Sequence, residues 1–92
     1  YRGWDMGIYI KSFKDLDVWQ LSMALARETY LVTENFPKKE IYGLVSQLRR
    51  ASVSIPSNIS EGHNRHSTKE YLQFIRIALG SVAELETQFI LC

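Results

Sequence analysis

The chain has 92 residues, 46% of them hydrophobic, and a formal net charge of +1 at pH 7. This size suits one small domain, and the absence of any run of roughly 18 apolar residues argues against a membrane span. A charge so close to neutral excludes a uniformly basic surface, so any patch that binds nucleic acid must be local.

Cysteine usage and the first residues bear on the cellular compartment. The single cysteine, Cys92, cannot form an internal disulfide, which is typical of a reducing cytosol. The first residues lack the basic stretch and continuous apolar run of a signal peptide. We therefore predict a cytoplasmic protein.

Residues 1–11 differ from the rest and form a predicted N-terminal arm. Trp4, Met6, Ile8 and Ile10 alternate with other residues, which is the period of a strand. Met6 also reads as a start codon, with the residues before it as upstream sequence. The arm is therefore either an ordered extension or an unstructured one.

From Ser12 the apolar residues recur with the period of an α-helix. Ser12 and Asp15 have the pattern of a helix start, and Pro37 ends the helix because proline disfavours helical backbone in the residue before it. This first helix is predicted over about residues 13–35. Its apolar stripe consists of Leu16, Trp19, Met23, Ala26, Tyr30 and Thr33.

Two further helices follow with the same three- and four-residue spacing. The second, predicted over about residues 39–62, ends in a turn made by Gly62 and the polar residues after it. The third, predicted over about residues 67–92, begins with a capping box of Ser67 and Glu70. The stripe of the second helix consists of Ile41, Leu44, Leu48, Ala51, Ile55, Asn58 and Gly62. The stripe of the third consists of Tyr71, Ile75, Ala78, Val82, Leu85, Phe89 and Cys92.

Three such helices with short connections predict an all-α fold, an antiparallel left-handed helical bundle over residues 12–92. The chain ends on the apolar run Phe89-Ile90-Leu91-Cys92, and three helices leave one groove of a bundle uncovered. Either a fourth helix is missing from this chain or another subunit fills the gap. Both alternatives predict association, or instability of the chain when it is alone.

The second helix carries polar residues that core packing alone does not require. Pro56 is expected to bend it, and Asn58 falls on its apolar stripe. Gln47, Ser54 and Glu61 form a polar line at seven-residue spacing. Such side chains beside an apolar stripe indicate hydrogen-bonded contacts with another helix or subunit. The alternative is that Asn58 and Gln47 face solvent at the edge of the bend.

Gly80 lies in the middle of the third helix. A glycine there costs about 1 kcal/mol relative to alanine. The close approach of another backbone is the usual compensation, and simple tolerance of the glycine is the alternative.

A series of short motifs runs in order through most of the chain. They are Phe13-Lys14-Asp15-Leu16, Val18-Trp19-Gln20, Phe36-Pro37, Tyr42-Gly43-Leu44, Ser46-Gln47-Leu48-Arg49-Arg50-Ala51, Ser54-Ile55-Pro56-Ser57-Asn58-Ile59-Ser60-Glu61-Gly62, Ala78-Leu79-Gly80-Ser81 and Glu84-Leu85-Glu86-Thr87-Gln88. In order and spacing this series resembles the four-helix-bundle proteins encoded by intervening sequences of bacterial 23S rRNA genes.

This resemblance implies further properties. The family is similar to the accessory variability proteins of diversity-generating retroelements, which form five-fold barrels and bind nucleic acid and a reverse transcriptase. It therefore implies a homo-oligomer, specifically a pentamer, with RNA or DNA and a reverse-transcriptase-like protein as partners and no membrane. The family's fourth helix is expected shortly after Cys92, where this sequence stops.

No catalytic, cofactor or metal site is predicted. Di-iron bundles need inward-facing Glu-x-x-His pairs, and the sequence contains none. His63 and His66, near Glu61, are ordinarily solvated loop residues, although an adventitious metal could bind them. Cys92 has no evident histidine base, and there is no phosphate-binding glycine loop. We therefore predict a non-enzymatic protein without cofactors.

Nucleic-acid binding is the function that we predict, and the family resemblance supports it more than the residues alone do. The candidate contacts are Arg49, Arg50, Arg65, Lys69 and Arg76, which suit phosphate oxygens. Interleaved acids such as Glu61, Glu70, Glu84 and Glu86 oppose this interpretation. The alternative is a protein-interaction scaffold that docks a partner enzyme, such as a reverse transcriptase, without touching nucleic acid.

Overall fold

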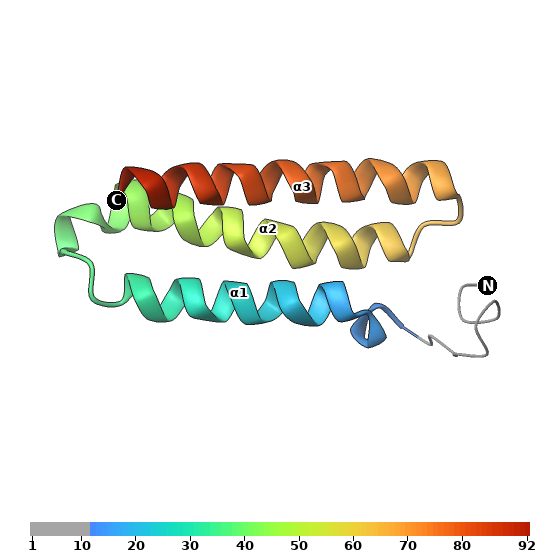
Figure 1. Ribbon diagram of the computed structural model, residues 1–92, viewed down its shortest axis with the longest axis horizontal. Helices are drawn as coiled ribbons and strands as arrows, with labels where there is room; N and C mark the ends of the chain where they lie inside the picture. Colours follow the sequence, from blue (N-terminus) through green and yellow to red (C-terminus); the bar gives the residue numbers. More distant parts are fainter. Residues whose placement is uncertain (1–11) are drawn as a thin grey trace.

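The computed structural model describes residues 12–92, so the predicted arm lies outside the described residues. Three long helices form this part of the chain: α1 (Asp17–Thr33), α2 (Ser46–His63) and α3 (Thr68–Leu91). They run antiparallel, with α2 between the other two in the view of Figure 1. The prediction of an all-helical domain with three helices is confirmed over these residues, which contain no strand.

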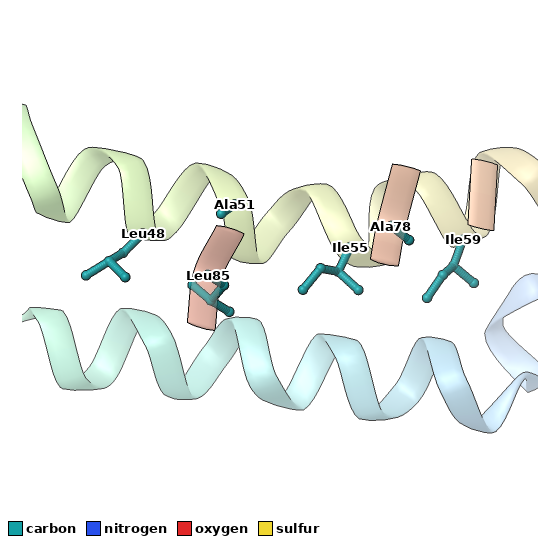
Figure 2. Close-up of a cluster of buried hydrophobic side chains, with 6 residues drawn as sticks. All are labelled: Leu48, Ala51, Ile55, Ile59, Ala78 and Leu85. Atoms are coloured by element: carbon teal, nitrogen blue, oxygen red, sulfur yellow. The ribbon is translucent and has the colours of Figure 1, made fainter. Parts of the chain in front are cut away.

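The central helix α2 holds the domain together. It packs against α1 and α3, whereas α1 and α3 make few contacts with each other. A cluster of buried apolar side chains forms most of the core of the described residues, and Figure 2 shows Leu48, Ile55 and Ile59 of this cluster pointing toward α1. Its members are Leu48, Ala51, Ile55 and Ile59 of α2 with Ala78 and Leu85 of α3. Full burial of each large aliphatic side chain contributes about 1.5–3 kcal/mol.

The start of α1 differs from the prediction. Ser12 and Asp15 do form a capping box, but it caps a short 3₁₀ turn, η1 (Phe13–Asp15). Leu16 then adopts extended backbone, with φ −78° and ψ 126°, and α1 begins at Asp17 without a side-chain cap. The helix therefore starts later than the predicted position near residue 13. It ends before Pro37, as predicted.

The connection between α1 and α2 contains two turns that sequence periodicity missed. A 3₁₀ turn, η2 (Lys38–Glu40), leads into a π-helical turn, η3 (Ile41–Val45). The α-helical part of α2 consequently begins at Ser46, not near residue 39. From there α2 is continuously helical through Pro56, although proline has no N–H to donate to the Ser52 carbonyl.

The turn between α2 and α3 corrects two predictions. Gly62 lies inside α2 and is buried, not in the turn. A Cβ atom there would lie 2.7 Å from Cβ of Phe74, so the glycine permits the close packing of α3. His63, the last residue of α2, is also buried, so it is not a solvated loop residue. Ser67 caps α3, with its hydroxyl accepting the Glu70 amide at 3.1 Å, which is one of the two bonds of the predicted capping box.

Candidate functional site

Polar side chains of α2 form a hydrogen-bonded seam with α3. The hydroxyl oxygens of Ser54 and Ser81 lie 2.8 Å apart. Asn58 donates through Nδ2 to the Ser54 carbonyl at 2.7 Å and to its hydroxyl at 3.0 Å. The structure thus gives the half-buried Asn58 a hydrogen-bonded role within α2, and its connection to α3 of the same chain runs through the Ser54 hydroxyl.

The seam continues from Ser54 toward the start of α2. Nε2 of Gln88 donates to Oε1 of Gln47 across a long 3.5 Å. Gln88 is buried, and its Oε1 atom has no hydrogen-bond partner within residues 12–92. A buried orphan of this kind costs about 1–3 kcal/mol. Glu61, in contrast, is exposed and takes no part in the seam.

Arg49 connects α2 to α1. Its Nε donates to Oγ1 of Thr33 at 2.9 Å, and its guanidinium carbon lies 4.6 Å from the centre of the Tyr30 ring. One terminal nitrogen reaches the Tyr30 carbonyl at 3.5 Å. The structure therefore gives this predicted phosphate contact a packing role, with terminal N–H groups still available.

Arg65 is also engaged within the chain. It forms a salt bridge of 2.9 Å with Glu61, and its guanidinium lies 4.8 Å from the centre of the Phe74 ring. Both charged side chains are substantially exposed, so the pair contributes at most about 1 kcal/mol. Its main consequence is that Glu61 offsets the charge of Arg65.

The five predicted cations do not form one patch. Arg49 and Arg50 lie near the start of α2, whereas Arg65 and Lys69 lie at the opposite end of the bundle. At 1.5 Å per residue, Arg50 and the end of α2 are roughly 20 Å apart. Arg50, Lys69 and Arg76 are exposed and form no ion pair within the described part of the chain.

Two apolar faces remain exposed. The first, on α1, consists of Val18, Leu21, Leu25 and Val32. The second, on α3, consists of Leu72, Leu79, Val82 and Ile90. Leu21, Leu79 and Ile90 expose 71%, 63% and 78% of their surface, and they lie outside the apolar stripes that face the core. No described helix is both long enough and apolar enough to cross a bilayer.

Two hollows lie on the surface of α1 and α2. A groove of about 670 Å³ runs between these helices and is largely apolar. We call it the α1–α2 groove; it is lined by Phe13, Trp19, Met23, Ala26, Arg27, Tyr30, Leu31, Val53, Pro56, Ser57 and Ser60. A second opening, of about 430 Å³, lies beside η3. We call it the Tyr42 pocket; it is lined by Tyr30, Tyr42, Val45, Ser46, Arg49 and Arg50.

Neither hollow was predicted from the sequence, and the close approach of another backbone was predicted at Gly80. Pro56 was expected only to bend α2, and Tyr42 entered only as part of a motif. Gly80 is exposed, and a Cβ built on it would meet no atom within 4 Å apart from its own chain neighbours and the adjacent backbone of α3. The close approach expected at Gly80 occurs instead at Gly62, and contact of Gly80 with another subunit stays a prediction. No group of three or more metal-ligating side chains occurs within residues 12–92.

The sequence matches a known protein family over nearly all of its length. Residues 14–92, which include all three helices, match a protein family described as 23S rRNA-intervening sequence protein. No curated protein matches the chain significantly. The family description names no enzymatic activity.

Proposed function

Because the chain belongs to the 23S rRNA-intervening sequence protein family, we propose that it is a non-enzymatic, self-associating helical subunit that binds nucleic acid through local basic patches. One observation carries the proposal: exposed apolar and basic side chains run side by side along α3. Lys69 and Arg76 are seven residues apart, as are Leu72 and Leu79, so each pair follows one line on the helix.

Self-association would cover the apolar faces of α1 and α3. Full burial of an exposed aliphatic side chain contributes about 1.5–3 kcal/mol, and each of these eight, already partly buried, would gain a fraction of that. A stable interface needs about 800 Å² from each partner. A pentamer is the subunit number that the family resemblance implies.

Association would also repeat the two basic residues of this line, Lys69 and Arg76, in every subunit. A contact through Leu72 and Leu79 leaves Lys69 and Arg76 at the edge of the interface, once in every subunit. Repetition raises the avidity for a polyanion without any new contact within a subunit. Gly80 follows on the same exposed side of α3 and leaves room for a phosphate backbone.

The salt dependence of binding tests this proposal. Fluorescence anisotropy with labelled RNA and DNA should show affinity that falls steeply with added salt. Changing Lys69 and Arg76 together to Ala should weaken binding and reduce the salt slope by about one for each phosphate that is no longer neutralised. Arg27→Ala removes the same kind of charge from α1 and serves as the control. Affinity that stays constant from low to high salt would contradict nucleic-acid binding.

A second candidate is a scaffold that docks a partner enzyme such as a reverse transcriptase. The observation that favours it is the α1–α2 groove, which suits the apolar side of an amphipathic helix. Such docking should survive added salt and be abolished in Val53→Asp, a change at the groove's exposed edge. In that case the Lys69 and Arg76 variants should bind the partner normally.

A further inference from the structure

Tyr42 presents an aromatic ring to solvent from an ordered helical turn. Its residue surface is 96% exposed, although it lies between η2 and α2 within the π-helical turn η3. The Ser46 amide donates to the Gly43 carbonyl and closes this turn against α2. Turns of this kind are rare and often occur at functional sites. The Tyr42 ring therefore projects into solvent from an ordered backbone.

Arg49 borders the same pocket with its guanidinium already oriented. The Thr33 hydroxyl and the Tyr30 ring hold it, so little side-chain entropy remains to be lost when an anion binds. The Nε of Arg49 already donates to Thr33, and one terminal nitrogen makes only a long 3.5 Å contact with the Tyr30 carbonyl. The other terminal N–H groups can therefore donate to phosphate oxygens.

The remaining lining completes a site for an anion with an aromatic group. Arg50 is exposed beside Arg49, Ser46 adds a hydroxyl, and no carboxylate lines the pocket. Glu84 shares a separate small hollow with Arg50 and offsets part of that charge. The volume of about 430 Å³ lies in the range of pockets that hold small ligands.

We infer that the Tyr42 pocket binds one unpaired base of a single-stranded nucleic acid, with the base stacked on Tyr42 and an adjacent phosphate on Arg49 and Arg50. The inference rests on the proposed nucleic-acid binding and gives it a specific site. A duplex cannot use this site, because its bases are stacked inside, whereas any unpaired base offers a face to an aromatic ring.

Three probes of equal length, about 12 nucleotides, separate stacking from charge. They are an all-thymidine DNA, an all-uridine RNA and an abasic DNA with the same phosphates. Tyr42→Ala should lower affinity for both base-bearing strands on the order of tenfold and leave the abasic strand unchanged. Tyr42→Phe should bind all three like the parent chain, because it keeps the ring. The affinities for the thymidine DNA and the uridine RNA, compared with each other, show whether the site prefers deoxyribose or ribose.

Charge and assembly controls complete the test. Arg50→Ala should weaken binding of all three probes, because each probe carries phosphates. Arg27→Ala is the control, and its effect on the affinity for each probe should be smaller. Salt-dependent binding of the parent chain that is unaffected by Tyr42→Ala overturns the site and leaves the proposed function standing. Failure of the parent chain to bind any single-stranded probe overturns the site, and failure to bind a duplex of the same length as well overturns the proposed function with it. Sedimentation that shows Tyr42→Ala breaking an oligomer would make Tyr42 a subunit contact and overturn the site.

Discussion

Asn58 and Ser54 are joined by two contacts at once, since the Asn58 amide donates to both the carbonyl and the hydroxyl of Ser54. The same Ser54 hydroxyl bonds Ser81 on α3. One amide thereby orients the hydroxyl that connects two helices. Because both Ser54 oxygens accept from residue 58, the side chain at that position must be a hydrogen-bond donor.

Replacing the donor by an acceptor should therefore destabilise the domain. Asn58→Asp places a carboxylate against the Ser54 carbonyl at a half-buried position, and the free energy of unfolding should fall by about 2–3 kcal/mol. Urea denaturation measures this. Ser57→Asp, on the exposed side of the same turn, is the matched control and should change stability by less than about 0.5 kcal/mol. Equal effects from the two variants would refute the role of the seam.

The two helical glycines should respond to alanine in opposite ways. Gly62→Ala introduces a methyl 2.7 Å from Cβ of Phe74 and should cost about 1–3 kcal/mol. Gly80→Ala meets no atom within 4 Å apart from its own chain neighbours and the adjacent backbone of α3, and should raise stability by up to about 1 kcal/mol. Thermal unfolding of both variants gives the comparison. Stabilisation by Gly62→Ala would show that α3 does not pack so closely.

Gln88 is a position where a nonpolar residue should be tolerated. Its buried Oε1 atom has no partner within residues 12–92, and its amide makes only a 3.5 Å contact with Gln47. Gln88→Leu should leave the free energy of unfolding unchanged or raise it by about 1 kcal/mol. Gln73→Leu, at an exposed position on the same helix, is the control. A decrease of more than about 1 kcal/mol in Gln88→Leu would indicate a bond that the described residues do not supply.

Arg49 and Arg50 should differ when each becomes lysine. Arg49→Lys keeps the charge but removes the bond from Nε to Thr33 and the planar contact with Tyr30, which should cost about 1 kcal/mol. Arg50→Lys, at the neighbouring exposed position, should have almost no effect. Denaturant unfolding distinguishes them, and equal stability of the two variants would argue against the packing role of Arg49.

The exposed apolar faces predict a change in assembly. Leu79→Glu places a charge on the α3 face and should shift the chain toward smaller species in sedimentation velocity experiments. Ala24→Glu, also exposed but on α1 outside the apolar face, is the control. A parent chain that sediments as a monomer at all concentrations would refute self-association.

Much of the fold is encoded in local sequence signals. Pro37 and the cap at Ser67 act within a few residues, so the ends that they define are correct. The π-helical turn, the buried position of Gly62 and the partners of Arg49 depend on how α2 meets the other helices. Periodicity along one chain segment contains no information on such contacts. For the same reason the sequence marked Tyr42 only within a motif and Pro56 only as a source of bending.

The face that α1 turns toward α2 has one further consequence. Its buried residues are small or hydroxylic: Ser22, Ala26, Thr29 and Thr33. The hydroxyls donate back to carbonyls of α1 itself, as Thr29 does to Leu25 at 2.9 Å. Of these hydroxyls, the one of Thr33 also accepts a bond from α2, from Nε of Arg49. Arg49 therefore supplies a polar connection between helices whose other contacts are mainly apolar, and α1 is the helix whose amide hydrogens should exchange with solvent first.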